Sequence, residues 1–269
     1  MNPIEIKQLH KTYVHHAWLG KKTEKEVLKN VTLTLQKGKV LGLVGESGCG
    51  KSTLCKVLLG IERISSGNVW VNGKEISCLT KAQWKNLRRE LQVVYQDPYG
   101  SLDPRMTVGQ LLSEPLDIHH LYLNKQERKN FLEQLVTSVG LSAQFLNRYP
   151  HEFSGGQRQR VCIARALALD PSILIADEPV SALDVSVQAQ ILNLLKDIKQ
   201  TRQLSMLFVT HDFGVARFLC DDIAVMYQGQ IVEFGPSETV LTRPQHAYTK
   251  RLLAAVPKAD PSRRGEWVL

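Results

Sequence analysis

The sequence lacks any hydrophobic run long enough to cross a lipid bilayer. Apolar stretches such as residues 40–44 and 173–176 have the length of a single strand, whereas a membrane-spanning helix needs about 20 apolar residues. Residues 1–7 also lack the basic-then-apolar pattern of a secretion signal. We therefore expect a soluble, intracellular chain.

Cysteine is scarce, and its spacing matches neither a disulfide framework nor a metal site. The five cysteines contain no CxxC pair and no metal-ligand spacing, so reduced thiols are expected. Low-complexity tracts are missing too, which argues against extensive disorder. The 269 residues are 43% hydrophobic, which is enough to bury a sizeable core in one large or two small domains.

The positive charge is spread along the chain rather than gathered in one block. A net charge of +8 is compatible with a polyanionic partner, either nucleic acid or an anionic membrane surface. No run of lysine and arginine is longer than a few residues. A dispersed, solvated surface charge is therefore the preferred interpretation, with closeness to a membrane second.

Short buried strands alternate with helical patterns, which predicts an α/β fold built on a mainly parallel sheet. Strands are predicted at residues 40–44, 173–176 and 206–209, where the sequence is apolar throughout. Between the last two strands, one helical face is predicted from the spacing of Val187, Ile191, Leu194, Leu195 and Ile198. These segments form a strand–helix–strand unit.

The middle of the chain, residues 100–165, shows no convincing strand and predicts a helical insertion. Asn124 is the candidate N-cap of one helix there, and Gly140 is its candidate end. Residues 223–226 and 231–234 predict a hairpin.

No internal repeat occurs, so we expect one domain over residues 1–269. Its core would comprise about 1–98 and about 165–235, its helical subdomain about 99–164, and a C-terminal extension about 236–269.

A glycine-rich segment at residues 45–53 matches the pattern G-x-x-x-x-G-K-[ST], after a predicted strand and before a helical pattern. Its glycines let backbone N–H groups curl around phosphates, and the helix N-terminus adds a positive end. Lys51 is placed to reach the β- and γ-phosphates, and the Ser52 hydroxyl suits Mg²⁺. A mere glycine-rich turn is the weaker alternative. The candidate nucleotide-binding residues of this phosphate loop are Gly45, Ser47, Gly48, Cys49, Gly50, Lys51, Ser52 and Thr53.

Cys49 lies inside the phosphate loop, just before a predicted helix N-terminus. That setting is expected to lower the pKa of the thiol and to favour the reactive thiolate. The alternative is an inert small residue whose side chain points away from nucleotide, and the sequence does not decide between the two.

Two adjacent carboxylates end the strand predicted at residues 173–176. Asp177 is placed to hold Mg²⁺, and Glu178 is placed to polarise the attacking water. Taken alone, a capping Asp-Glu pair would be the better interpretation. Together with the phosphate loop, the catalytic interpretation is preferred.

A second anion-binding helix N-terminus is predicted about a hundred residues after the first. Ser154, Gly155, Gly156 and Gln157 open it. Their order, after the phosphate loop and shortly before the paired carboxylates, resembles the ABC ATPase family. The family's signature usually begins with leucine, and Phe153 stands there in this chain, which leaves the phosphate-facing residues unchanged.

The resemblance covers nearly the whole chain and implies a P-loop NTPase core, a mainly parallel sheet with an antiparallel β portion, carrying an inserted helical subdomain. It implies that Tyr13 stacks on adenine, although a core tyrosine at a strand end is a serious alternative. Gln96 would contact Mg²⁺ and the attacking water. Asp184 would report across a dimer interface, and His211 would contact the γ-phosphate.

ATP and Mg²⁺ are the cofactors that the resemblance implies. The implied metal-binding residues are Ser52, Gln96 and Asp177, and the implied catalytic residues are Glu178, His211 and Gln96.

Longer segments resemble one branch of the family, the oligopeptide/dipeptide/nickel importer ATPases. These segments are residues 96–106, 176–190 and 243–257. Members commonly pair two different ATPase subunits, and several of the first kind carry a cysteine cluster after the tail. No cysteine follows Cys220 here, so the chain resembles the second kind.

The branch resemblance implies a set of partners and a location. The partners are a second ABC ATPase subunit in a heterodimer, two transmembrane permease subunits and, indirectly, an extracytoplasmic substrate-binding protein, with no nucleic acid. The chain would be peripheral on the cytoplasmic face of the inner membrane. Peptide is the first candidate cargo, and nickel or another metal chelate is the second.

The implied mechanism places ATP between two such domains, head to tail, so that one chain supplies two half-sites. A nucleic-acid ATPase with the same core is the main alternative, but long coiled-coil insertions, zinc sites and a second ATPase half are all missing from the sequence. A binding module without turnover is disfavoured by Glu178, Gln96 and His211. A Walker-type kinase is disfavoured by residues 154–157.

Overall fold

A six-stranded sheet forms the centre of the chain in the computed structural model, which describes residues 1–16, 22–121 and 124–255. Its strand order is β10-β9-β3-β8-β7-β6, and each neighbouring pair is parallel except β10–β9. The strands predicted at residues 40–44, 173–176 and 206–209 are confirmed as β3, β7 and β8. The six strands are β3 (Val40–Val44), β6 (Leu91–Val94), β7 (Ile173–Asp177), β8 (Ser205–Thr210), β9 (Asp222–Tyr227) and β10 (Gln230–Pro236).

The central strands are apolar throughout because both faces of the sheet are covered. In β7, Leu174 and Ala176 pack into one hydrophobic core, whereas Ile173 and Ile175 pack into a second core on the other face. This alternation is the period of two that a strand imposes on its side chains. The strands are in register, with Asp177 opposite Val209, so the carboxyl ends of β7 and β8 meet at one edge of the sheet.

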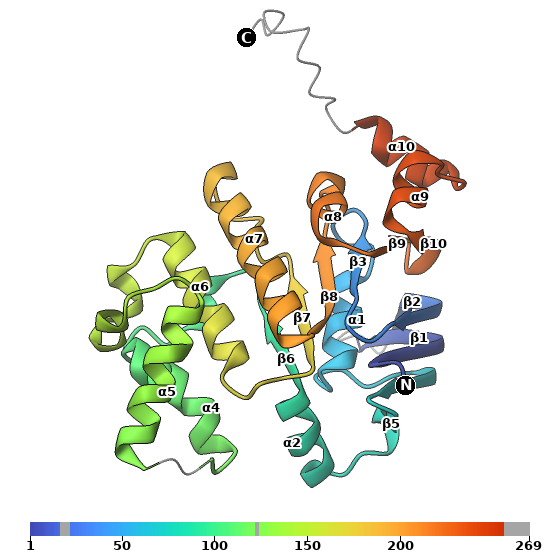
Figure 1. Ribbon diagram of the computed structural model, residues 1–269. Helices are drawn as coiled ribbons and strands as arrows, with labels where there is room; N and C mark the ends of the chain where they lie inside the picture. The colour runs from blue at the N-terminus through green and yellow to red at the C-terminus, as the bar shows by residue number, and fades with distance from the viewer. Residues whose placement is uncertain (17–21, 122–123, 256–269) are drawn as a thin grey trace, which may run out of the picture.

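A second, antiparallel sheet has the strand order β2-β1-β4-β5 and is seen beside the central sheet in Figure 1. Ile4, Leu33 and Val69 of this sheet share one hydrophobic core with helix α1 (Lys51–Leu58) and with Leu207 of β8. The expected antiparallel portion of the fold is thereby confirmed. Its strands are β1 (Ile4–His16), β2 (Lys22–Leu35), β4 (Ser66–Val71) and β5 (Lys74–Glu75).

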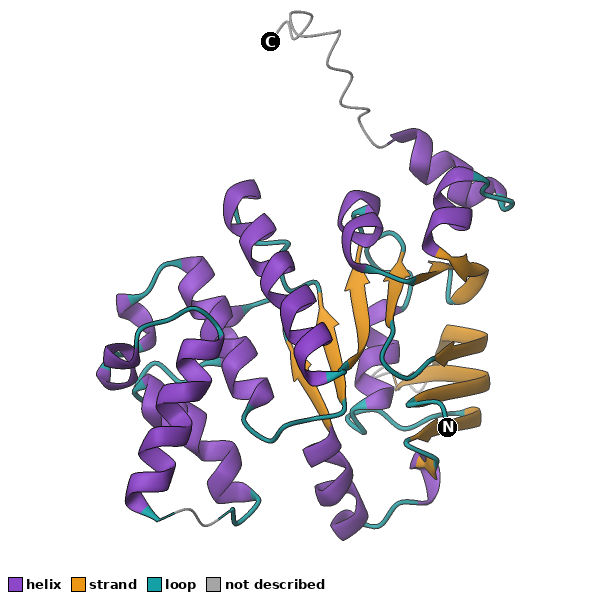
Figure 2. Ribbon diagram, in the orientation of Figure 1, coloured by secondary structure: helices purple, strands orange, loops and turns teal. Residues whose placement is uncertain are grey.

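Helices lie beside the strands of the central sheet, as Figure 2 shows. The predicted amphipathic helix is confirmed as α7, which buries Ile191, Leu195 and Ile198 in the same core as Phe208 of β8. The helices around the sheet are α1 (Lys51–Leu58), the 3₁₀ turn η1 (Ile76–Cys78), α2 (Lys81–Glu90), α7 (Val185–Arg202) and α8 (Phe213–Leu219).

A helical lobe connects β6 to β7, and Figure 1 shows it on the other side of the central sheet from β1 and β2. No strand occurs among the residues that the structure describes between these two strands, in agreement with the predicted helical insertion. Asn124 is the N-cap of α5 and accepts a 2.8 Å hydrogen bond from the Glu127 N–H. The lobe comprises α3 (Pro98–Ser101), α4 (Val108–Ile118), α5 (Lys125–Ser138), η2 (Ala143–Asn147), η3 (Pro150–Glu152) and α6 (Gly155–Leu167).

The predicted hairpin is confirmed by β9 and β10, which are joined at Gln228 and Gly229. Both turn residues have positive φ, 47° and 85°, as a two-residue type I′ turn requires. The chain continues into α9 (Ser237–Thr242) and α10 (Ala247–Ala255), red in Figure 1. The remainder of the expected C-terminal extension, residues 256–269, lies outside the described residues. Within the described part of the chain, no helix is both long enough and apolar enough to span a membrane.

Candidate nucleotide-binding site

The phosphate loop joins β3 to α1 and packs closely against β9. A Cβ atom added at Gly45 would lie 2.3 Å from the carbonyl oxygen of Met226, so only glycine is accommodated there. Gly48 and Gly50 have φ angles of 78° and 119°, in the region that favours glycine. The sequence pattern therefore produces a curled loop whose shape depends on its glycines.

Lys51, the first residue of α1, is 4% exposed and turns back over the loop. Its Nζ donates hydrogen bonds to the carbonyl oxygens of Gly45 (2.6 Å) and Glu46 (3.0 Å). The same ammonium lies 3.9 Å from Oε1 of Glu178. The buried positive charge is thus held between the loop and the end of β7, where a phosphate would replace the carbonyl contacts.

Glu178 follows β7 and is fixed in an uncommon backbone conformation. Its φ is 47°, which costs energy for a residue with a Cβ atom and recurs at functional sites. Its N–H donates to the Val209 carbonyl (3.0 Å), and its own carbonyl accepts from the Ser181 hydroxyl (3.0 Å). The side chain is thereby aimed at His211, whose Nδ1 lies 3.1 Å from Oε2 of Glu178.

Asp177, the last residue of β7, is half-buried beside Glu178. Burial raises the pKa of the Asp177 carboxyl, and the neighbouring Glu178 raises it further, while the Lys51 charge and a hydrogen bond from the Ser52 side chain oppose the shift. A cation close to such a carboxyl would favour its ionised form and so offset these effects.

A pocket of about 580 Å³ opens over the phosphate loop. It gathers most of the predicted site residues: Gly45, Ser47, Gly48, Gly50, Lys51, Ser52, Thr53, Gln96, Glu178 and His211. Sequence reasoning missed Val27 and Leu252, which line the same pocket. Val27 belongs to β2 and Leu252 to α10, and no local pattern marks either as a site residue.

Tyr13 lies in β1 and does not line this pocket. The Lys11 ammonium lies 4.6 Å from the centre of the Tyr13 ring. The same ammonium forms an ion pair with Glu62 at 2.8 Å. The adenine contact expected of Tyr13 stays a prediction.

The Cys49 side chain points under the loop rather than into the pocket. It is 8% exposed, and its Sγ would lie 2.9 Å from a Cβ atom added at Gly45. Burial raises the pKa of the Cys49 thiol, and the Lys51 charge only partly opposes the effect. The expected lowering of this pKa is therefore wrong, because packing beneath the loop outweighs the helix N-terminus. The alternative, an inert residue pointing away from nucleotide, agrees with this geometry.

A maleimide is expected to modify Cys78 first and Cys49 slowly, with or without Mg-ATP. Cys78 is exposed, whereas the other four cysteines are buried, and a buried thiol of raised pKa reacts poorly. Peptide mass spectrometry over a time course measures both rates, and Cys78→Ser should remove the fast phase. Labelling of Cys49 as fast as that of Cys78 in the folded chain would contradict the packing.

The helix N-terminus predicted at residues 154–157 is confirmed as the start of α6, and its binding of an anion stays a prediction. Ser154 is its N-cap, accepting from the Gln157 N–H, while the Gln157 side chain accepts from the Ser154 N–H at 3.0 Å. A Cβ atom at Gly156 would lie 2.3 Å from Val187, whereas at Gly155 it would meet only Leu183, at 3.4 Å. Gly156 is therefore required for packing, and Gly155 is not.

Phe153 fills the position where the signature usually has leucine. It is buried in the helical lobe, edge-on to Phe145 with ring centres 5.1 Å apart. Asp184 is the N-cap of α7 and accepts from the Val187 N–H at 2.9 Å. None of residues 153–157, nor Asp184, lines the pocket over the phosphate loop.

Residues 28–181, more than half of the chain, match the protein-family model described as ABC transporter. The chain belongs to the ABC transporter family. Residues 232–268 match a second model, described as the C-terminal region of oligopeptide/dipeptide transporters.

Named relatives agree with both matches. The chain is 51% identical to the glutathione import ATP-binding protein GsiA of Pectobacterium atrosepticum, over 88% of this chain but only 38% of that protein. It is 46% identical to the oligopeptide transport ATP-binding protein OppF of Escherichia coli, over 91% of this chain and 73% of that protein. Of the expected oligopeptide/dipeptide/nickel branch, membership among the oligopeptide/dipeptide ATP-binding subunits is confirmed.

A solved structure of the ATP-binding cassette MJ0796 is similar over 87% of this chain and 98% of its own, with a TM-score of 0.77 and 30% identity. It is a dimer in a post-hydrolysis state bound to ADP and phosphate. The expected P-loop NTPase fold with its mainly parallel sheet is confirmed.

Proposed function

We propose that this ABC subunit binds and hydrolyses ATP, with Mg²⁺, to energise a membrane importer of peptides. The proposal depends mainly on one observation: a single pocket brings Lys51, Glu178 and His211 together with the phosphate loop. Relatives named for glutathione import and oligopeptide transport support a peptide cargo. A nickel or other metal-chelate cargo is the alternative that the branch resemblance offers.

The side chains at the ends of β6 and β7 and at the start of α1 suit a magnesium ion. The Ser52 hydroxyl, the Asp177 carboxylate and the Gln96 amide provide the hard oxygen donors that Mg²⁺ prefers. The Ser52 side chain is close enough to Asp177 to lower the pKa of that carboxyl, so two of the three lie together. We assign these three residues to the ion. When bound, Mg²⁺ would neutralise charge on the phosphate oxygens.

Residues of this chain would bind the phosphates and activate the attacking water. Lys51 and the loop N–H groups would bind the phosphates, since an ammonium and a helix N-terminus both attract anions. Glu178 would accept a proton from the attacking water, because its carboxylate is fixed at the pocket wall and 16% exposed. His211 would hold Glu178 and contact the γ-phosphate.

Residues 154–157 are proposed to complete a nucleotide site on a partner subunit. They form a helix N-terminus that lies outside the chain's own phosphate pocket, and the dimeric MJ0796 structure supports pairing of two such domains. Asp184 follows Leu183, whose side chain would lie 3.4 Å from a Cβ atom added at Gly155, and Asp184 would then lie near the dimer interface. The proposed partner is a different ATPase subunit, of the cysteine-bearing kind.

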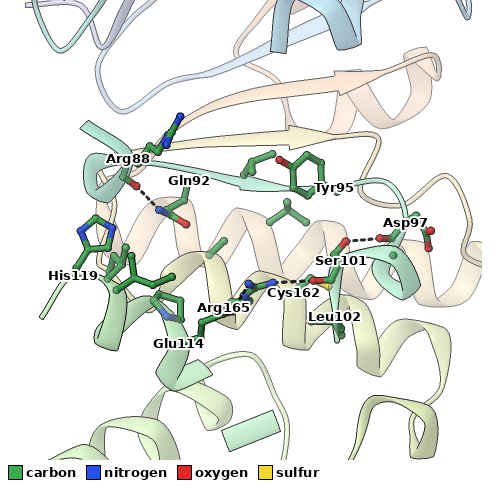
Figure 3. Close-up of a pocket in the computed structure, with 17 residues that line it drawn as sticks. Arg88, Gln92, Tyr95, Asp97, Ser101, Leu102, Glu114, His119, Cys162 and Arg165 are labelled. Atoms are coloured by element: carbon green, nitrogen blue, oxygen red, sulfur yellow. Dashed lines mark hydrogen bonds and ion pairs between the residues drawn. The ribbon is translucent and has the colours of Figure 1, made fainter. Parts of the chain in front are cut away.

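Two transmembrane permease subunits are proposed to dock through a groove that begins next to Gln96 in the sequence, at Tyr95 and Asp97. The groove, of about 710 Å³, lies between β6 and α2 of the core and α4 and α6 of the lobe, with Asp97 on its wall (Figure 3). Arg165 braces it by donating to the Ser101 carbonyl (2.8 Å) and pairing with Glu114 (2.5 Å). Docking here would make the chain peripheral on the cytoplasmic face of the inner membrane, with an extracytoplasmic binding protein reached only through the permeases.

Lys51→Ala is expected to weaken Mg-ATP binding by about 10- to 100-fold, the loss of one charge-assisted hydrogen bond. Lys56→Ala is the matched control, because Lys56 lies exposed on the same helix. Isothermal titration of both variants gives the affinities, and thermal melting checks that Lys51→Ala remains folded. Equal affinities of the two folded variants would refute the site.

A further inference from the structure

The C-terminal helix α10 contacts the phosphate loop directly. The Glu46 N–H donates a 3.2 Å hydrogen bond to the Tyr248 hydroxyl, across 202 positions of sequence. Tyr248 is 3% exposed. Burial raises the pKa of its phenol, which favours the protonated form at neutral pH. The contact therefore joins the branch-specific tail to the second residue of the loop.

Tyr248 is held in place by the β9–β10 hairpin. Its ring stacks on that of Tyr227, with centres 4.0 Å apart. The Glu233 carboxylate accepts the N–H groups of Gln245 (2.7 Å) and His246 (3.1 Å), which ties the start of α10 to β10. The hairpin also meets the loop, because the Gly229 N–H donates to the Cys49 carbonyl (2.9 Å). The position of α10 is thus determined by several independent contacts.

Leu252 lies one helical turn after Tyr248 and lines the phosphate pocket. Residues four apart share one face of a helix, so both side chains lie toward the loop. Among the described residues that line this pocket, Leu252 and Val27 are aliphatic and the others are glycine or polar. An apolar surface beside a phosphate site suits the nucleoside part of a nucleotide.

We propose that α10 is a working part of the nucleotide site. Tyr248 holds the phosphate loop in the curled conformation that receives phosphates, and Leu252 forms, with Val27, an apolar wall against which the nucleoside packs. The proposal rests on the proposed function, because it assumes that the pocket takes ATP. Its physical basis is preorganisation: a loop already held in its binding conformation loses less entropy when the ligand arrives.

Tyr248→Phe tests the hold on the loop, since it removes only the hydroxyl and keeps the ring on Tyr227. In the nucleotide-free chain, amide hydrogen exchange of residues 45–50 should become several-fold faster. The dissociation constants of Mg-ADP and of Mg-tripolyphosphate should both rise about fivefold, the loss of one hydrogen bond. Tyr227→Phe is the matched control. It removes a hydroxyl that accepts a 3.1 Å hydrogen bond from the Gln228 side chain and that makes no hydrogen bond with the described residues of the phosphate loop, so it should change neither exchange nor affinity.

Leu252→Ala tests the apolar wall with the same two ligands. The dissociation constant of Mg-ADP should rise about fivefold, and that of Mg-tripolyphosphate, which has no nucleoside, should stay within twofold. Leu253→Ala is the control, because Leu253 packs against the core but does not line the pocket.

Each result supports or overturns a defined part of the proposal. Loop exchange within twofold of wild type in folded Tyr248→Phe would overturn the hold on the loop. Equal weakening of both ligands by Leu252→Ala, or no weakening, would overturn the wall. A wild-type chain that binds no Mg-ADP would instead refute the proposed function, and the exchange experiment would still decide the role of Tyr248.

Discussion

Replacing Glu178 with glutamine is expected to reduce ATP turnover by about 100-fold or more, the usual contribution of a positioned general base. Glutamine has the same shape but a far weaker basicity, so it would leave the attacking water unactivated. Binding should survive, because the phosphate loop is held by Lys51 and its own carbonyls rather than by Glu178. The variant should accumulate bound ATP.

The test compares phosphate release by the assembled transporter with Mg-ATP affinity of the isolated chain. Glu133→Gln, on the outer surface of α5, makes the same chemical change away from the site and should behave as wild type. Parental turnover in Glu178→Gln would remove Glu178 from the mechanism. Loss of binding together with turnover would instead make Glu178 part of the binding site.

The central strands and the phosphate loop were predictable because each is specified locally. Because strands β3, β7 and β8 are buried on both faces, each has a short apolar sequence. The sequence pattern of the loop sets the spacing between its glycines and Lys51, and all of these residues belong to one short segment. The helical lobe was predictable for the same reason, since caps such as Asn124 act within one helical turn.

The antiparallel sheet was expected but could not be located from the sequence. The burial pattern of strand β1 does not alternate regularly, because Lys7 and Gln8 are both exposed, and β1 pairs with β2 through register shifts between Ile6 and Thr12. Such irregular pairing blurs the period of two on which strand prediction depends.

Long-range packing decides the parts of the site that the sequence missed. The Cys49 thiol is governed by burial beneath Gly45, which depends on the docking of β9. Tyr248 contacts the phosphate loop, and Leu252 lines the pocket, because the β9–β10 hairpin positions α10. A short sequence pattern cannot predict contacts between residues that lie two hundred positions apart.

Gly155→Asp is expected to disable the composite site formed with the partner subunit while sparing this chain's own nucleotide binding. Gly155 is the first residue of α6, and a Cβ atom there meets only Leu183 at 3.4 Å. The substitution therefore places a carboxylate at the helix end without a clash. Two unit charges 4 Å apart repel by about 4 kcal/mol at an effective dielectric constant of 20, so a γ-phosphate docking there would be strongly opposed.

Gly155→Asn is the matched control, because asparagine has the same shape and lacks the charge. ATPase activity of the assembled complex should fall at least about tenfold in Gly155→Asp relative to Gly155→Asn, since even partial repulsion at this distance exceeds one factor of ten. Mg-ATP affinity of the two isolated variants should agree within twofold, because the α6 N-terminus lies outside the chain's own phosphate pocket. A Gly155→Asp complex as active as the Gly155→Asn complex would show that hydrolysis does not require this helix end, and the split site would have to be abandoned.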